Sequence, residues 1–217
     1  MVRLRLLQGR ILTLLGLLDR AADEFDTAQA QLSGLDDPQL ESSLLEAQAR
    51  REQESARLEN PGALVRAQSL LRRSVEIDRK IGDQRALGLH LRMLANVLSE
   101  AGRGQAALAL LDGAPAPSGD PRNAARLHMV RAKAWLSLGS GADAGRELTR
   151  AGDLLEGGGA DQYELELTDL RGRAALLDGD VGTARECWRR VAFHYAIAKH
   201  PREREFLDRL AALPEAS

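Results

Sequence analysis

Five glycines recur along the chain at similar intervals, and each stands at the centre of the same pattern of residue types. An alanine stands five residues after each glycine, a small residue seven before it, and a large apolar residue nine after it. The glycines are Gly16, Gly62, Gly102, Gly139 and Gly179. A pattern that repeats in this way predicts a chain built from copies of one small structural unit.

The repeating unit is expected to be a helical hairpin. Apolar residues recur every three or four positions on both sides of each glycine, which is typical of amphipathic helices. A glycine takes up the left-handed backbone at low cost, so we expect it to end the first helix of each unit. The 39 leucines and 34 alanines, against 11 valines and isoleucines together, also favour helix over strand. The sequence therefore predicts an all-α protein.

The pattern resembles the tetratricopeptide repeat (TPR), in a variant with long repeats. The resemblance extends from about Leu4 to Val191, and the glycines are 46, 40, 37 and 40 residues apart, against about 34 in the family. It implies a right-handed α-solenoid of about five TPR-like hairpins plus a C-terminal capping helix, forming a single repeat domain over residues 1–217. The expected repeats cover residues 3–34, 38–80, 84–115, 121–156 and 161–198, and the capping helix covers 201–213.

The residues that carry catalysis or metal binding are sparse. No phosphate-binding loop is present, and no two of the four histidines stand three or four residues apart, so we expect surface or groove histidines, no metal site and no cofactor. Cys187, the single cysteine, excludes an internal disulfide, and we expect it to be a small buried residue of a cytoplasmic protein. These observations predict a protein that is not an enzyme.

Charge and hydropathy exclude two classes of partner. The 30 basic and 32 acidic residues give a net charge of −2, which provides no field to attract nucleic acid. No run of apolar residues approaches the roughly 18 that a membrane-spanning helix needs. A protein or peptide partner is the expectation that remains.

The TPR resemblance also implies where such a partner would bind. In that family the first helices of successive hairpins line a concave groove, and the matching positions of this chain are mainly basic in its second half. The expected partner-binding residues are Arg92, Asn96, Arg126, Met129, Lys133, Asp169 and Arg173. They would suit an acidic segment or a free C-terminal carboxylate; alternatively, the charges form a solvated face and bind nothing.

The first helix has more apolar residues than burial on one side requires. We expect Leu4, Leu7, Ile11, Leu14, Leu15 and Leu18 to form an N-terminal interface. The interface would be covered by an upstream domain or by a second copy of the chain in a homodimer, or else the helix is poorly ordered or partly exposed.

Two functions follow from these expectations. The first is a non-enzymatic scaffold that holds a partner segment in a partly basic concave groove. The alternative is a regulatory TPR module of a larger signalling or transcription-regulator system, acting through the N-terminal interface or homodimerisation. Stretches such as SVEIDRKIGDQRALGLHLRMLANVLSE give the chain a looser resemblance to the TPR tails of actinobacterial (bacterial) regulators.

Overall fold

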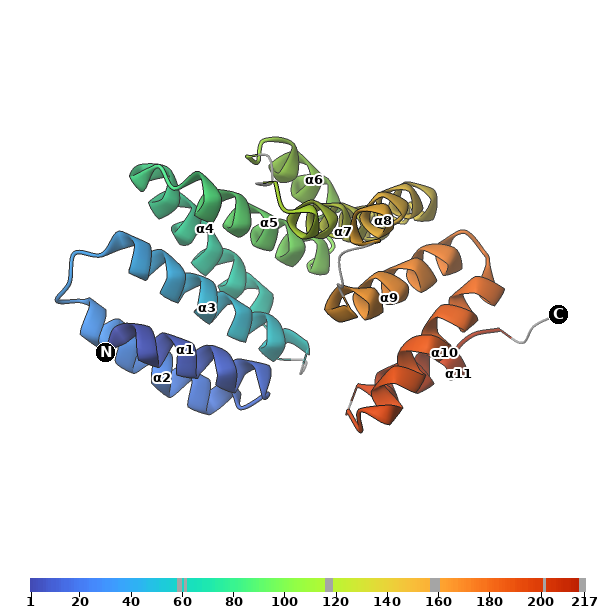
Figure 1. The fold of residues 1–217 in the computed structure, drawn as a ribbon, viewed down its shortest axis with the longest axis horizontal. Coiled ribbons are helices and arrows are strands. Elements are labelled where there is room, and N and C mark those ends of the chain that lie inside the picture. Colours follow the sequence, from blue (N-terminus) through green and yellow to red (C-terminus); the bar gives the residue numbers. More distant parts are fainter. Residues whose placement is uncertain (58–59, 61, 116–118, 157–160, 201, 215–217) are drawn as a thin grey trace. The chain divides into compact units, whose positions relative to one another are not determined.

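The chain is entirely helical wherever its structure is described. The computed structural model describes residues 1–57, 60, 62–115, 119–156, 161–200 and 202–214, and within them there are eleven α-helices and no strand (Figure 1). In chain order the helices are α1 (Val2–Leu14), α2 (Leu18–Leu32), α3 (Pro38–Arg57), α4 (Ala63–Ile81), α5 (Gln84–Glu100), α6 (Gly104–Asp112), α7 (Pro121–Ser137), α8 (Gly141–Leu155), α9 (Asp161–Leu177), α10 (Val181–Ile197) and α11 (Glu203–Ala211). The all-α prediction is confirmed.

The five glycines of the repeating pattern all have a left-handed backbone. Their φ angles lie between 72° for Gly102 and 82° for Gly179, a region that residues with a Cβ rarely adopt. Each glycine lies between the first and second helix of a successive pair, from α1 and α2 to α9 and α10. The prediction that such a glycine ends the first helix is confirmed for four of the pairs, whereas Gly62 caps the start of the second helix, α4.

Short polar side chains start at least four of the helices. Asp83, Asp120 and Asp180 accept hydrogen bonds from backbone N–H groups in the first turns of α5, α7 and α10, and Ser140 does the same for α8. These bonds satisfy N–H groups that have no partner within the helix. Local sequence thus sets both the turn and the next helix start in much of the chain.

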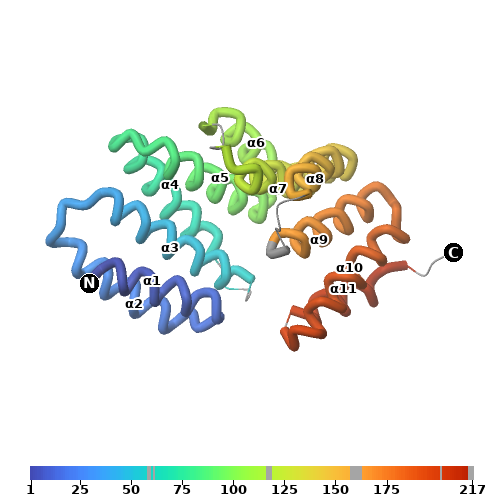
Figure 2. Tube along the Cα trace, viewed as in Figure 1, coloured from blue at the N-terminus to red at the C-terminus, as the bar shows by residue number. Residues whose placement is uncertain are grey.

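The chain divides into two compact units, whose residues can be followed by number along the trace in Figure 2. Unit 1 comprises residues 1–101 and 109–116, which include α1 to α5 and the end of α6. Unit 2 comprises residues 102–108 and 117–217, which include the start of α6 and α7 to α11.

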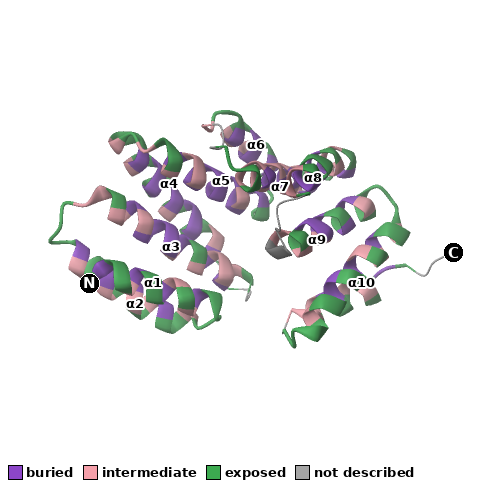
Figure 3. Ribbon diagram, viewed as in Figure 1, coloured by how far each residue is buried: buried purple, intermediate pink, exposed green. Residues whose placement is uncertain are grey.

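In unit 1, α1 packs against both α2 and α3, α3 packs against α4, and α4 packs against α5. Phe25 of α2 lies at the centre of the first part of this core and is 1 % exposed. Its ring lies over Gly9 of α1, where an added Cβ would come closer than 3.0 Å to the ring. Figure 3 shows the buried residues on the packed faces of these helices and exposed residues along α1. Gly9 thus provides the space for Phe25.

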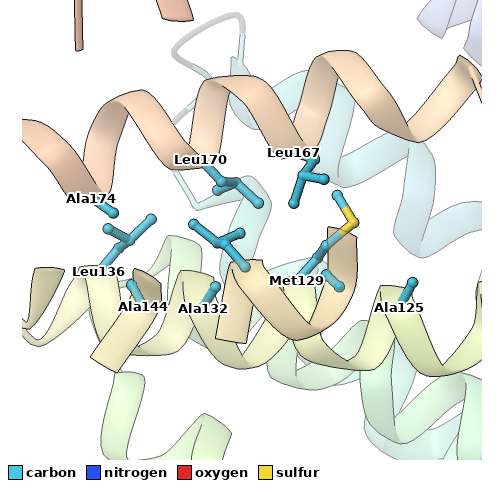
Figure 4. Packing of buried hydrophobic residues seen from close by; sticks show 10 residues of the cluster. Ala125, Met129, Ala132, Leu136, Ala144, Leu167, Leu170 and Ala174 are labelled. Atoms are coloured by element: carbon cyan, nitrogen blue, oxygen red, sulfur yellow. The ribbon is translucent and has the colours of Figure 1, made fainter. Parts of the chain in front are cut away.

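In unit 2, α7 packs against α8 and α9, and α10 packs against α9 and α11. Leu167, Leu170 and Ala174 of α9 face Met129 and Leu136 of α7 across a dense apolar cluster (Figure 4). At the other end of the unit, Trp188 of α10 covers Gly172 of α9, as Phe25 covers Gly9. Phe206 anchors α11 against α10 beside Trp188, within the range predicted for the capping helix.

Candidate functional site

A hollow of about 410 Å³ lies between α1 and α3 in unit 1. We call it the α1–α3 hollow; its lining residues are Arg3, Leu6, Leu7, Arg10, Asp37, Gln39, Leu40 and Ser43. Its walls therefore combine two guanidinium groups with leucine side chains. The hollow lies on the first helices of the first two hairpins, the surface on which the sequence predicted partner binding.

Arg10 holds one wall of this hollow in place. Its Nη2 donates to Glu46 Oε2 at 2.5 Å and to the carbonyl oxygen of Ser43 at 3.3 Å, so the side chain is tied to α3. Its Nε is buried and has no hydrogen-bond partner within the described part of the chain. Because this donor is buried, it is not open to a ligand in the hollow, and Arg10 would bind one through its other N–H groups.

The predicted groove residues of unit 1 are engaged by their own chain. Arg92 of α5 is only 9 % exposed, and Asn96 donates to Glu100 Oε1 at 3.0 Å. Both residues have further interactions. Arg92 therefore lies largely within the helical packing, not on the surface expected for a ligand-binding cation.

The predicted groove residues of unit 2 differ widely in exposure. Arg126 of α7 lies over the ring of Tyr163 at 5.6 Å, and Lys133 Nζ is 2.7 Å from Glu166 Oε1. Met129 is buried in the α7–α9 cluster, whereas Arg173 of α9 is exposed. Contact between α7 and α9 thus leaves Arg173 and the half-buried Arg126 as the more accessible cations of this set.

Asp169 has a clear structural role. One of its carboxylate oxygens, Oδ1, accepts from Trp188 Nε1 at 3.0 Å and from Arg209 Nη1 at 2.6 Å. Arg209 also lies over the rings of Trp188 and Phe206. Asp169 therefore links α9 to α10 and α11.

Five of the six leucine and isoleucine residues predicted for the N-terminal interface are exposed, and Leu18 is half-buried. The opposite face of α1, formed by Val2, Leu6, Gly9 and Thr13, is buried in unit 1. The helix therefore has one covered apolar face and one uncovered apolar face.

A buried cluster of serine, aspartate and histidine was not anticipated from the sequence. Asp78 of α4 accepts from Ser42 Oγ at 2.6 Å through Oδ1, and its Oδ2 lies 2.6 Å from His90 Nδ1. Ser74 Oγ lies 2.8 Å from the same histidine nitrogen. These four residues, the buried polar cluster, join α3, α4 and α5 and are at most 4 % exposed.

The expectation of surface or groove histidines was wrong for His90, because its ring is part of this cluster. His128 is half-buried, with Nδ1 2.6 Å from Glu147 Oε2, whereas His194 and His200 are exposed. A signal for the cluster did exist. Asp78 stands in phase with Ala67, Leu71 and Ser74, the interior positions of the repeating pattern, so a charged group there required buried partners.

The buried polar cluster has the residue types of a nucleophilic triad but not the geometry. In a triad, the base uses one ring nitrogen for the carboxylate and the other for the nucleophile. Here Asp78 and Ser74 both lie at Nδ1 of His90. Fully buried hydroxyls in such an arrangement act as hydrogen-bonding groups of the core.

Cys187 is half-buried, so it is less buried than the sequence led us to expect. Burial, and then the negative charge of Glu186, raises the pKa of its thiol above the ordinary value. The thiolate is the reactive form, so a raised pKa makes this cysteine a poor nucleophile near neutral pH.

Among the described residues, no group of three or more histidine, cysteine, aspartate or glutamate side chains is arranged to hold a metal ion. No helix in the described ranges has the length and apolar character needed to cross a membrane. Neither a protein-family model nor a curated protein matches this sequence.

Proposed function

We propose that this protein is a non-enzymatic interaction scaffold of TPR-like helical hairpins, which holds a segment of a partner protein against the first helices of its hairpins. The α1–α3 hollow carries the proposal, because it lies on those helices and combines cations with apolar walls. The right-handed solenoid of five hairpins within one repeat domain remains the expected arrangement.

The chemistry of the hollow suits an acidic segment or a free C-terminal carboxylate. Arg3 is exposed and lines the hollow, and the guanidinium of Arg10, paired with Glu46, is the second cation on its wall. Guanidinium groups bind carboxylates through strong charge-assisted hydrogen bonds. Leu6 and Leu40 would accommodate an apolar side chain next to the acidic group.

The two accessible cations of unit 2 also favour an acidic partner segment. Arg126 and Arg173 are carried by α7 and α9, the first helices of their own hairpins. Met129 and Arg92 contribute through packing instead, because both are buried. Binding by accessible arginines predicts an affinity that falls as the salt concentration rises.

The non-enzymatic part of the proposal is supported by the buried polar cluster. Among the described residues, this cluster comes nearest to a catalytic triad in its residue types. However, Ser74 and Asp78 both lie at the same ring nitrogen of His90. The raised pKa of the only thiol also disfavours a cysteine nucleophile. A reducing compartment such as the cytoplasm fits a protein with one free cysteine.

The test compares a groove variant with a charge-matched control in pull-downs from source-cell lysate. The groove variant is Arg3→Glu, Arg126→Glu, Arg173→Glu, and the control is Arg72→Glu, Arg79→Glu, Arg189→Glu, whose exposed arginines belong to the second helices α4 and α10. Both variants must show the helical circular dichroism and thermal midpoint of the wild type. Each changes the net charge equally.

We expect proteins captured by the wild type and by the control to be lost by the groove variant. Their binding segments, as synthetic peptides, should bind the wild type in titration calorimetry and weaken with added salt. Equal capture by the wild type and both variants would contradict binding on the first helices.

A regulatory module that acts through an N-terminal interface is the second candidate, and the uncovered apolar face of α1 favours it. This function does not depend on the arginines, so the groove variant would leave it intact.

A further inference from the structure

The first helix has two apolar faces on opposite sides. The inner face, formed by Val2, Leu6, Gly9 and Thr13, is buried in unit 1. The outer face of α1 consists of Leu4, Leu7, Ile11 and Leu14, which are 57 %, 55 %, 48 % and 87 % exposed. A helix that is apolar on both sides is normally covered on both sides.

The spacing along the outer face is that of a helix-pairing seam. Its residues are three, four and three positions apart, the alternation that lets one helix pack along another. The spacing also reads the same in both directions, with its centre level with Gly9. An antiparallel copy of the same helix would therefore present the same pattern.

We propose that this protein forms a two-fold symmetric homodimer in which α1 packs antiparallel against α1 of a second copy. Leu4 would lie against the partner subunit's Leu14, and Leu7 against the partner subunit's Ile11. Met1, Leu15 and Leu17, which are also exposed, flank this seam. A two-fold interface uses one surface patch twice, so one uncovered face is sufficient for closure.

The charges on α1 are compatible with this pairing. The helix carries Arg3, Arg5 and Arg10 and no acidic residue. Antiparallel packing brings the two Arg10 residues near the symmetry axis, but each is paired with Glu46 of its own chain. Arg5 is likewise paired with Glu24 at 2.9 Å. In the same register the remaining arginine, Arg3, would lie level with the partner subunit's Leu15, which is uncharged.

The extent of exposed apolar surface also favours a dimer. The four seam residues and the neighbouring Met1, Leu15 and Leu17 together expose more surface than four fully exposed leucines would. Exposed apolar surface of this extent usually marks an interface.

The oligomeric state tests the proposal directly. We expect the wild type to sediment at twice its chain mass of 23.6 kDa in the micromolar range. The variant Ile11→Glu, Leu15→Glu should sediment as a monomer with unchanged helical content, because both side chains are exposed and neither lines the α1–α3 hollow. The matched control Phe193→Glu, Ile197→Glu changes two exposed apolar residues of α10, also four apart, and should remain a dimer.

Disulfide cross-linking tests the orientation in a Cys187→Ser background. A mixture of Leu4→Cys and Leu14→Cys proteins should form a cross-linked heterodimer under mild oxidation, whereas Leu4→Cys alone should not cross-link. Cross-linking of Leu4→Cys to itself would overturn the antiparallel register. A wild type that stays monomeric up to millimolar concentration would overturn the dimer and leave another protein or an anionic membrane surface as the occupant of this face.

Discussion

At the scale of single residues, the hairpins depend on matched sizes across each pair of helices. A small residue stands seven before each turn glycine and a large one nine after it: Gly9 and Phe25, Ser55 and Leu71, Ala95 and Leu111, Ala132 and Leu148, and Gly172 and Trp188. In this pattern glycine accompanies an aromatic residue, and alanine or serine accompanies leucine. A Cβ on Gly9 or on Gly172 would collide with the ring that covers it.

This size matching predicts a rescue. Gly9→Ala should lower the free energy of unfolding by about 1–3 kcal/mol, because the added methyl group overpacks a filled site. Adding Phe25→Leu recreates the small–leucine pair of the other hairpins and should recover part of the loss. Urea unfolding of the two single variants and the double variant measures the coupling, which we expect to be about 0.5–3 kcal/mol. Additive effects would contradict direct contact between the two positions.

The buried polar cluster leads to a second prediction at this scale. Asp78→Ala should destabilise the protein by about 3–5 kcal/mol, because His90 and Ser42 lose their shared buried acceptor. The double variant Asp78→Ala, His90→Leu should lose less free energy of unfolding than the two single variants lose together. The reason is that an apolar side chain at position 90 needs no hydrogen-bond partner. Chemical unfolding followed by circular dichroism measures these values. The exposed Asp26→Ala is the control, expected within about 0.5 kcal/mol of the wild type.

At the scale of elements, helices and turns could be predicted because their causes are local. A left-handed glycine, a capping aspartate and a three-to-four apolar spacing act over a few residues and can be read directly from the sequence. The partners of individual side chains could not, because they come from distant elements. Lys133 meets Glu166 and Asp169 meets Arg209 only after α7, α9 and α11 have packed. The same packing buries Met129, a candidate from the groove pattern.

The last helix, α11, lies at the C-terminal end of unit 2 and should detach independently of the other helices. Phe206 is 1 % exposed and lies beside Trp188, whereas its neighbour Leu207 is 45 % exposed. Phe206→Ala should release α11, with a cost of at most about 3–5 kcal/mol, because the other helices of unit 2 can stay folded. We expect faster amide exchange in α11 and a red-shifted Trp188 emission. Leu207→Ala should change neither, and an unshifted emission in Phe206→Ala would contradict this anchoring role.

At the scale of the whole molecule, the repeating pattern does not indicate where the helices pack densely and where they pack sparsely. Every hairpin has a glycine, an alanine and a large apolar residue at the same positions of the pattern. The sequence therefore predicts one repeat domain, which the structure does not test. The structure groups the helices into two compact units, with the division inside α6. In a chain of stacked repeats, stability is carried by each repeat and its nearest neighbours. A local defect should therefore weaken its own unit first.

Ala144 tests this expectation. It is completely buried in the cluster between α7, α8 and α9, so Ala144→Leu should overpack unit 2 by about 1–3 kcal/mol. Hydrogen exchange measured by mass spectrometry should then accelerate in α7 to α10, while α1 to α4 exchange as in the wild type. Ala142→Leu, two residues away and exposed, controls for the larger side chain. Equal acceleration in every helix would mean that the chain unfolds as one cooperative body, since only coupling across both units could spread the defect that far.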